Sequence, residues 1–190
     1  MTYTIHRYPA HLIDVIRLDD GRRVTVRPVL PQDAELQQAF VRTLSNAARR
    51  SRFMSPLGEL PDALAQRFSS IDYRNHVALL AEVFTGGEEV MVAEARYVVD
   101  EQDTSVCEFA IAVADAWRGS GLARPLLERL ERHARCAGIR RMVADTLAGN
   151  DAMIRLARAA GFTVATNRED ARLLRLEKYL GSHPVDTLAA

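Results

Sequence analysis

The sequence predicts a mixed α/β domain in which a mostly antiparallel central sheet is flanked by helices. Three apolar, strand-like segments follow one another at 76–84, 90–99 and 106–113. Their connections are short, so the three strands can form an antiparallel meander. After residue 113 the pattern changes to alternating helices and strands, and the two patterns in one chain are typical of a mixed α/β fold.

Length and composition limit the class of protein. With 190 residues, 48% of them hydrophobic and 26% charged, the chain is typical of one compact domain. Lys+Arg and Asp+Glu are both 25, and this balance argues against broad binding to nucleic acid or to anionic membranes. Residues 1–20 are polar and interrupted by Pro9, unlike a signal peptide, and no apolar run is long enough to span a membrane. We therefore expect a cytoplasmic protein.

The N-terminal part predicts a β-hairpin followed by helices. Apolar residues alternate over 12–18, a "DDG" turn signal follows, and the alternation resumes at 24–26. Helical spacing then begins, with apolar residues three or four apart over 36–44. These patterns divide the chain into a hairpin extension at 1–28, a core at 29–180 and a flexible tail at 181–190.

The C-terminal part predicts helices that alternate with strands. Leucines at helical spacing over 121–137 indicate an amphipathic helix, which Gly138 ends. A second helix begins at Asn150 or Asp151 and ends at Gly161. Strands are expected at 141–146, 162–165 and 171–179.

A glycine-containing loop, "ADAWRGSGLA", connects the third strand of the meander to the first of these helices. A triphosphate-binding P-loop needs a lysine after its last glycine, and the only lysine of the chain is Lys178. A dinucleotide-binding loop needs three glycines, whereas Arg124 occupies the third position after Gly119 and Gly121. Asp145, at the end of the next strand, keeps this second alternative open because an acidic ribose ligand could lie there.

Arg118, Gly121 and Ala123 form an R-x-x-G-x-A pattern. This pattern is similar to the acetyl-CoA loop of the GNAT superfamily of N-acetyltransferases. A helix start offers backbone N–H groups without internal partners and a positive dipole end, so it can bind a pyrophosphate. The resemblance implies that acetyl-CoA is bound by the loop and by the strand before it, at Ile111, Val113, Arg118, Gly119, Ser120, Gly121, Leu122 and Ala123.

A second motif follows at the expected distance. The segment "NDAMIRLARAAGF", residues 150–162, resembles the downstream GNAT segment in which an Asn opens a helix that ends in Gly-Phe. Asn150 can be a plain helix cap, and it can also face the pantetheine arm of acetyl-CoA. Two motifs in the right order favour the GNAT fold and an acetyl-CoA-dependent transferase.

The resemblance extends over nearly the whole chain to the catalytic domain of Pat-type bacterial protein lysine acetyltransferases. It includes "DGRRVTVRPVLPQD", "IDYRNHVALLAEV" and "CEFAIAVADAWRGSGLA". Such enzymes often carry a cyclic-nucleotide-binding or an acyl-CoA-synthetase-like domain, and 190 residues leave no room for either. The resemblance therefore implies a stand-alone catalytic domain whose acceptor is a protein lysine.

Transfer to an amine needs a base, because the amine of a free lysine side chain has a pKa near ~10.4 and is almost wholly protonated at neutral pH. The Pat-like pattern has its proposed base at Glu108. On this strand Glu108, Ala110 and Ala112 share one face, and Phe109 lies on the face that packs under the helices. We expect Glu108 to be partly desolvated beside the cleft, with a raised pKa. Glu82, Glu94 and His76 are weaker alternatives.

Other catalytic groups follow from the resemblance. A backbone N–H in the region of 111–113 is expected to stabilise the oxyanion. In many GNAT enzymes a Tyr in the Asn-Gly-Phe helix protonates the leaving thiolate, but here Ala157 stands at that position. Pro125 is expected beyond the first turn of its helix, where it would remove a backbone bond and bend the helix.

The acceptor side is expected to be framed by 43–57 and 71–76. The segment "ARRSRF" places Arg49, Arg50 and Arg52 near it, where they could favour an acidic protein surface or an anionic small substrate, or simply form a solvated helix face. Cys107 and Cys136 lack the spacing of a metal site, and no metal is expected.

Four functional interpretations remain open. The leading one is acetyl-CoA-dependent acetylation of a protein lysine, by a monomer or a homodimer. The alternatives are acetylation of a small amine, and a CoA-binding regulatory module without catalysis. A nicotinamide-binding protein is the least favoured of the interpretations, and it would require Asp145.

Overall fold

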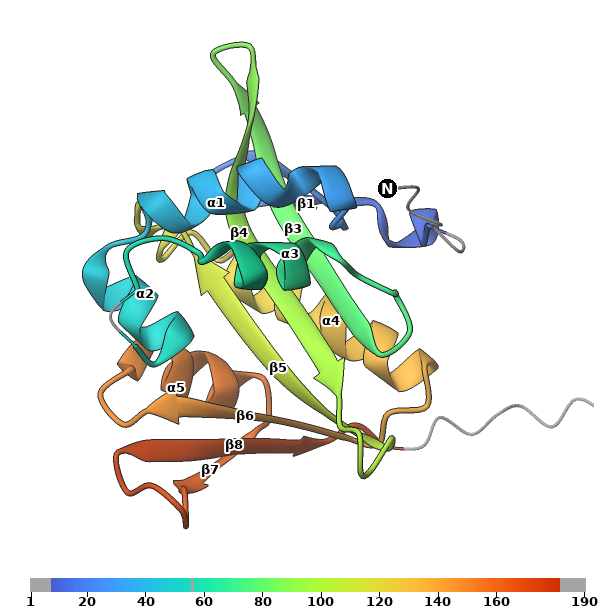
Figure 1. Ribbon diagram of the computed structural model, residues 1–190, viewed down its shortest axis with the longest axis vertical. Helices are drawn as coiled ribbons and strands as arrows, with labels where there is room; N and C mark the ends of the chain where they lie inside the picture. Colours follow the sequence, from blue (N-terminus) through green and yellow to red (C-terminus); the bar gives the residue numbers. More distant parts are fainter. Residues whose placement is uncertain (1–7, 56, 182–190) are drawn as a thin grey trace, which may run out of the picture.

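The computed structural model describes residues 8–55 and 57–181, which form one sheet with helices on both faces (Figure 1). The strands are β1 (Asp14–Arg17), β2 (Arg23–Pro28), β3 (His76–Thr85), β4 (Glu88–Val99), β5 (Val106–Val113), β6 (Arg141–Leu147), β7 (Thr163–Thr166) and β8 (Leu173–Tyr179). The α-helices are α1 (Ala34–Thr43), α2 (Asn46–Phe53), α3 (Asp62–Ser69), α4 (Ala123–Cys136) and α5 (Asp151–Ala159). Short 3-10 turns lie at Ala10–Leu12, Pro31–Asp33 and Asp115–Trp117.

The strands of the described residues form a single sheet in the order β1-β2-β3-β4-β5-β6-β8-β7. Neighbouring strands are antiparallel except for β5 and β6, which run parallel. The predicted meander is β3-β4-β5, and the predicted N-terminal hairpin is β1-β2. The mixed α/β fold with a mostly antiparallel sheet is therefore confirmed.

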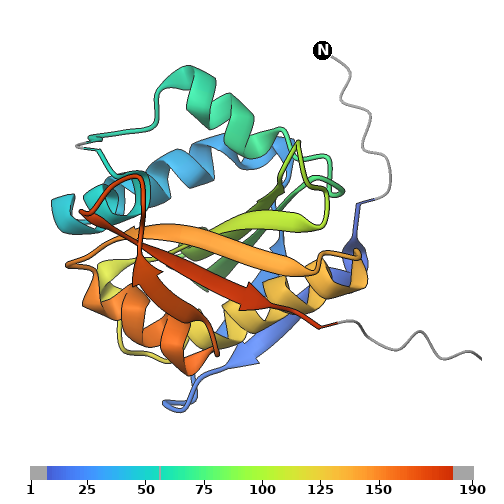
Figure 2. The same ribbon diagram turned by 90° about the horizontal axis from the view of Figure 1, so that it is seen from below.

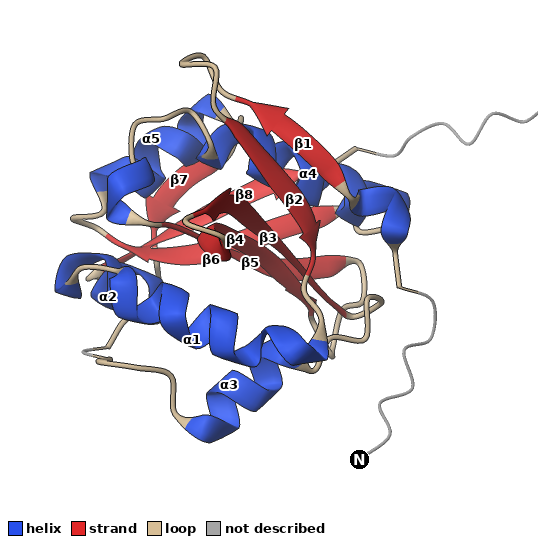
Figure 3. Cartoon of the chain, turned by 90° about the horizontal axis from the view of Figure 1, so that it is seen from above, coloured by secondary structure: helices blue, strands red, loops and turns tan. Residues whose placement is uncertain are grey.

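The helices form two layers with the sheet between them. Figures 2 and 3 show α1, α2 and α3 on one face of the sheet, and α4 with α5 on the other. Buried leucines of α4, among them Leu126, Leu127 and Leu130, pack with Phe109 and Tyr97 on their face of the sheet. The opposite core is built on α1 and the central strands, with residues such as Phe40, Val41, Leu80 and Ala112.

The hairpin is joined to the rest of the domain by the pairing of β2 with β3 and by contacts of cationic side chains. Asp14 of β1 accepts hydrogen bonds from the guanidinium of Arg129 on α4. The guanidinium carbon of Arg22, in the hairpin turn, lies 4.0 Å from the centre of the Trp117 ring. The hairpin is thus part of the same folded unit as the core. The tail predicted for 181–190 lies outside the described residues except for Gly181.

Two expectations about α4 need correction. The helix begins at Ala123 rather than at 121, because Gly119 and Gly121 have φ angles of +72° and +83° in the left-handed region. Pro125 is therefore the third residue of the helix and not beyond its first turn. At that position a backbone N–H would have no partner inside the helix, so Pro125 removes no helical bond. None of the described helices is long and apolar enough to cross a membrane.

Candidate functional site

The candidate site lies where β5 and β6 separate. The two strands are paired from Val106 opposite Arg141 to Glu108 opposite Val143, and their pairing ends there. Figure 1 shows them meeting at the lower right and diverging toward α2 and α5. A cleft of about 730 Å³ opens between them. It is lined by 109–113 of β5 and 144–146 of β6, by the starts of α4 and α5, and by part of α2.

The glycine loop forms one end of this cleft. Arg118, Gly119, Gly121, Leu122 and Ala123 all line it. Both glycines have positive φ and empty space at the position of a Cβ, so they are needed for the backbone conformation and leave the wall of the cleft open.

Ser120, which was expected to bind the cofactor, does not line the cleft. Its hydroxyl donates a hydrogen bond of 2.7 Å to the carbonyl of Trp117 and accepts one from the N–H of Leu122. Ser120 thus shapes the turn from inside the loop.

The start of α4 offers free hydrogen-bond donors to the cleft. Among the described residues, the backbone N–H groups of Ala123 and Arg124 have no acceptor, and both residues line the cleft. Pro125, the next residue, has no N–H at all. Two free donors at the positive end of a helix dipole are suited to an anionic group such as a pyrophosphate.

Asn150 lies on the wall opposite the loop. Its side-chain oxygen accepts a hydrogen bond from the N–H of Met153 and so caps α5, and its amide nitrogen donates to the hydroxyl of Thr146. The residue also lines the cleft. Because the amide has two N–H donors, one remains for a ligand.

The open edge of β5 supplies further donors. The N–H of Ala114 donates to the carbonyl of Val92, toward β4. Successive N–H groups of a strand point to opposite neighbours, so those of Ile111 and Val113 point toward the opening. Both residues line the cleft and, like Phe109, pack with the core under α4.

Glu108 lies at the closed end of the opening, on the other face of the strand. It is opposite Val98 of β4 in register and shares its face with Ala110 and Ala112, which line the cleft. The side chain is exposed and is not among the residues that line the cleft. The expectation that Glu108 is partly desolvated is therefore wrong for the free protein.

The alternative bases are held by other groups. Glu82 accepts hydrogen bonds of 3.1 Å from the Nε of Arg27, and Glu94 is buried among Arg96, Arg52 and Gln37. The Nε2 of His76 lies 3.1 Å from Arg96 Nη1. Burial, followed by the charge of Arg96, lowers the pKa of His76 to about 4, so at neutral pH this imidazole is uncharged.

The dinucleotide-binding interpretation is excluded by the fold. That interpretation needs a parallel sheet of βαβ units, whereas among the described strands β5 and β6 are the one parallel pair. Asp145 does line the cleft, but Asn167 and Arg175 hydrogen-bond to its carboxylate. The described residues contain no group of three or more His, Cys, Asp or Glu placed to hold a metal ion.

Ala157 is fully buried in the core. Its methyl side chain cannot donate a proton. The role that the resemblance gives to a tyrosine here, protonation of the leaving thiolate, is therefore not filled at this position.

The structure separates the three arginines that are expected at the acceptor side and adds Trp117, which the sequence interpretation does not assign. Of the three arginines expected at the acceptor side, Arg52 lines the cleft. Arg49 donates to the carbonyls of Val41 and Arg42 at the end of α1, and Arg50 is exposed. Trp117 also lines the cleft. These side chains carry no periodic or motif signal that separates them from the other arginines and apolar residues of the chain.

Known proteins resemble this chain in sequence and in structure. The model of the acetyltransferase (GNAT) family matches residues 41–162, which include β5, the glycine loop and the segment from Asn150 to Phe162. Acetyltransferase PA5475 of Pseudomonas aeruginosa is 36% identical over 154 residues, which cover 81% of this chain and 82% of that protein.

Two Pat proteins are also similar. Acetyltransferase Pat of Mycolicibacterium smegmatis is 28% identical over 174 residues, which cover 91% of this chain and 50% of that protein, so the chain spans about half its length. The crystal structure of the GNAT domain of S. lividans PAT superposes with a TM-score of 0.84 at 32% identity, covering 91% of this chain and 99% of that one.

Proposed function

The chain belongs to the acetyltransferase (GNAT) family, and we propose that it transfers the acetyl group of acetyl-CoA to the side-chain amine of a protein lysine. The observation that carries the proposal is the cleft between β5 and β6. It joins the free N–H groups at the start of α4 to the open edge of β5. It thus provides a binding site for an extended cofactor with an anionic group at one end and a reactive carbonyl at the other.

Acetyl-CoA would lie along this cleft. The pyrophosphate would accept hydrogen bonds from the loop at 118–123 and from the N–H groups of Ala123 and Arg124. The pantetheine arm would run between β5 and β6, where the free amide donor of Asn150 faces it. The thioester carbonyl would then lie near the N–H groups of Ile111 and Val113.

Glu108 is proposed as the general base. The acceptor amine must lose a proton to attack the thioester carbon, and a carboxylate on the acceptor side can take it directly or through one water. Attack forms the C–N bond and places negative charge on the carbonyl oxygen, which the N–H groups of β5 stabilise. Collapse then breaks the C–S bond. Ala157 cannot act as an acid, and we propose that coenzyme A leaves as a thiolate, which solvent then protonates.

Protein lysine is proposed as the acceptor because the GNAT domain of S. lividans PAT and the Pat acetyltransferase of Mycolicibacterium smegmatis are both similar to this chain. We further propose that the protein is cytoplasmic and acts as a monomer or a homodimer. Residues 1–28 are proposed to be an extension of a single catalytic domain.

The experiment that tests this function measures acetyl transfer to candidate amines. The protein is incubated with acetyl-CoA and either lysine peptides with blocked ends or a panel of small amines, and products are identified by mass. Acetylated peptide is the expected result. Acetylation of a small amine alone would make small amines, and not protein lysines, the substrate class. Acetyl-CoA binding without transfer to any amine would indicate a regulatory module.

A further inference from the structure

We propose that Arg52 binds a carboxylate next to the acceptor amine, so that the enzyme prefers lysines with a neighbouring Asp or Glu. This inference rests on the proposed function, because it names a feature of the same acceptor. The observation that supports the inference is a buried cluster of side chains that contains two guanidinium groups and one carboxylate. The cluster consists of Gln37, Arg52, Glu94 and Arg96 and is called the Glu94 cluster below.

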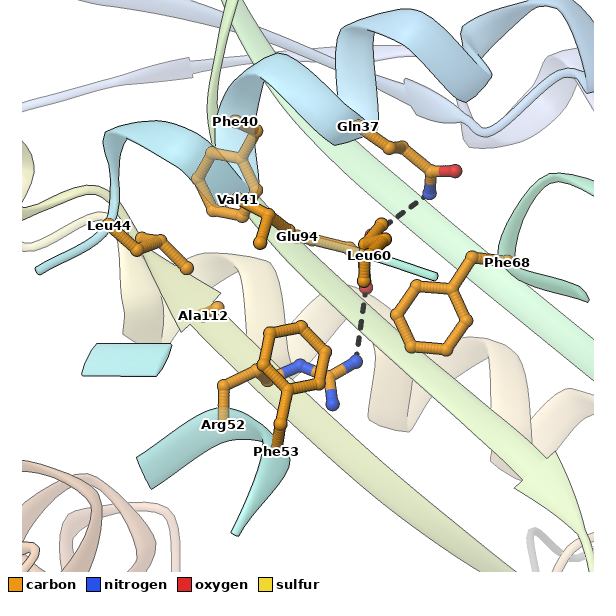
Figure 4. A pocket seen from close by; sticks show the side chains of 10 residues that line it. All are labelled: Gln37, Phe40, Val41, Leu44, Arg52, Phe53, Leu60, Phe68, Glu94 and Ala112. Carbon is orange, nitrogen blue, oxygen red and sulfur yellow. Dashed lines mark hydrogen bonds and ion pairs between the residues drawn. The ribbon is translucent and has the colours of Figure 1, made fainter. Parts of the chain in front are cut away.

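The Glu94 cluster lies between the sheet and the helices α1, α2 and α3. Glu94 and Arg96 project from β4, Gln37 comes from α1 and Arg52 from α2. Figure 4 shows the amide of Gln37 and the guanidinium of Arg52 reaching Glu94 from two sides, at 3.0 Å and 3.3 Å. Arg96 Nε donates to the same carboxylate at 2.5 Å. One carboxylate therefore serves two guanidinium groups.

The charges of this cluster do not cancel. Burial by itself would raise the pKa of Glu94, but Arg96 and Arg52 outweigh it and hold this pKa at about 2. Burial lowers the pKa of Arg52, and Arg96 adds to the effect, while Glu94 and Glu108 oppose it. A guanidinium nevertheless stays protonated in proteins. His76, the ring next to Arg96, is neutral at neutral pH. Counted over its four side chains, the cluster thus carries an excess of one positive charge. The charge of Glu108 acts on Arg52 from outside the cluster, but among the described residues the two form no ion pair, so N–H edges of the guanidinium remain for an additional anion.

Hydrogen-bond donors remain free in the cluster. Arg96 Nη2 is buried and has no partner among the described residues. Arg52 uses Nη2 for Glu94, and its Nε and Nη1 have no acceptor among the described residues. Its side chain is 11% exposed, so the guanidinium is held in place but is not sealed from the cleft that it lines. Phe53 and Phe68 flank it at 5.0 Å and 5.3 Å from their ring centres.

Arg52 lines the cleft that donor and acceptor share, but its helix places it on the acceptor side. Coenzyme A would be held by α4 and α5, on the opposite face of the sheet. Arg52 belongs to α2, beside Ala112 and on the same face as Glu108. An amine that gives its proton to Glu108 therefore brings its neighbouring groups against Arg52. A planar guanidinium with free N–H edges is suited to a carboxylate, which it can bind with two hydrogen bonds.

The test uses short peptides with blocked ends and one lysine. One set carries a Glu immediately before or after the lysine, and a matched set carries Gln. For the wild-type protein, kcat/KM should be at least about tenfold higher for the better Glu peptide than for its Gln partner, as expected for a charge-assisted contact. Arg52→Gln should reduce this ratio to about one, and Arg52→Lys should give an intermediate ratio. Arg50→Gln, an exposed arginine of the same helix, serves as the control and should keep the wild-type ratio.

The outcomes separate this inference from the proposed function. If wild-type protein acetylates Glu and Gln peptides equally, the carboxylate site is overturned and lysine acetylation stands, even if Arg52→Gln does not fold. If no peptide is acetylated, both are overturned. Free lysine and lysinamide form a second pair: an Arg52-dependent preference for lysine over lysinamide, without peptide acetylation, assigns the carboxylate to a small substrate. If the activity depends on Arg52 only when the acyl donor is a dicarboxylic acyl-CoA, the carboxylate that Arg52 binds belongs to the donor. Either result overturns the peptide assignment.

Discussion

Glu108 of β5 lies opposite Val143 of β6 at the last position where the two strands are paired. One residue further along, Phe109 and Ala144 already line the cleft. The candidate base is thus placed at the point where the sheet opens, and the backbone of β5 beyond it is free to bind the cofactor. This relationship links the fold to the proposed chemistry, because one irregularity of the sheet creates the cofactor site and the acceptor side together.

Glu108→Gln is expected to lower kcat at least about 100-fold and to leave the affinity for acetyl-CoA nearly unchanged, since general base catalysis contributes on the order of 10²–10⁴. The measurement is steady-state release of coenzyme A together with calorimetric titration. Glu101→Gln, in the exposed turn before β5, is the matched control and should have wild-type kcat. Full activity of Glu108→Gln at neutral pH would remove Glu108 from the mechanism.

Glu94→Gln is expected to destabilise the fold by about 3–5 kcal/mol, because it leaves two buried guanidinium groups without a counter-ion. Since the pKa of Glu94 is held at about 2, its contribution should be complete above about pH 4.5 and be lost as the pH falls through 2. Free energies of unfolding in urea measure the effect.

Glu82→Gln is the control for this substitution. Its partner Arg27 keeps a second carboxylate, Asp33, at 2.7 Å, so a loss of about 1–2 kcal/mol is expected. Equal losses of the free energy of unfolding for the two variants would show that Glu94 stabilises its two guanidinium groups no more than Glu82 stabilises Arg27.

His76 predicts a dependence of stability on pH. Its pKa is lowered to about 4, whereas the unfolded chain titrates near 6.5. Between these values the unfolded state binds a proton that the folded state does not, so stability is complete above about pH 6.5 and falls toward pH 4. Between about pH 7 and 5, the free energy of unfolding should fall by about 1–2 kcal/mol less in His76→Gln than in the wild type. This figure includes a reduction because the ring is partly solvated. Parallel pH profiles for wild type and variant would contradict the assignment.

Local periodicity predicted most of the architecture. The strands β3, β4 and β5 and the helices α4 and α5 were each expected within a few residues of their observed bounds, since an apolar face at a fixed period is a strong signal. The error in the start of α4 has the clearest structural consequence. Two glycines with positive φ delay the helix. Pro125, which was expected to remove a helical bond and bend the helix, is therefore a first-turn residue that removes none.

The acceptor side could not be predicted in the same way. Alternation along β4 does not show that Glu94 and Arg96 are buried, because polar residues on one face of a strand usually face solvent. They are covered only because α1, α2 and α3 pack on that face. Arg52 could not be separated from Arg49 and Arg50 for a similar reason: its distinction is a tertiary contact to Glu94. The exposure of Glu108 likewise depends on what the helices leave uncovered.

The glycine loop provides a sharp variant for the cofactor site. Gly121→Glu is expected to abolish acetyl-CoA binding, because a carboxylate would occupy the place of the pyrophosphate and because φ at this position is +83°. Gly86→Glu is the matched control: Gly86 has φ +63° at the tip of the β3–β4 hairpin, with open space around it, and does not line the cleft. This variant should bind acetyl-CoA as wild type does.

The most direct test of the account is calorimetric titration of the purified protein with acetyl-CoA, with NADH as the paired control. The expected result is saturable binding of acetyl-CoA that Gly121→Glu abolishes and Gly86→Glu preserves, and no binding of NADH. Failure of the wild-type protein to bind acetyl-CoA, or equal binding by wild type and Gly121→Glu, would contradict the assignment of the cleft between β5 and β6 as the cofactor site.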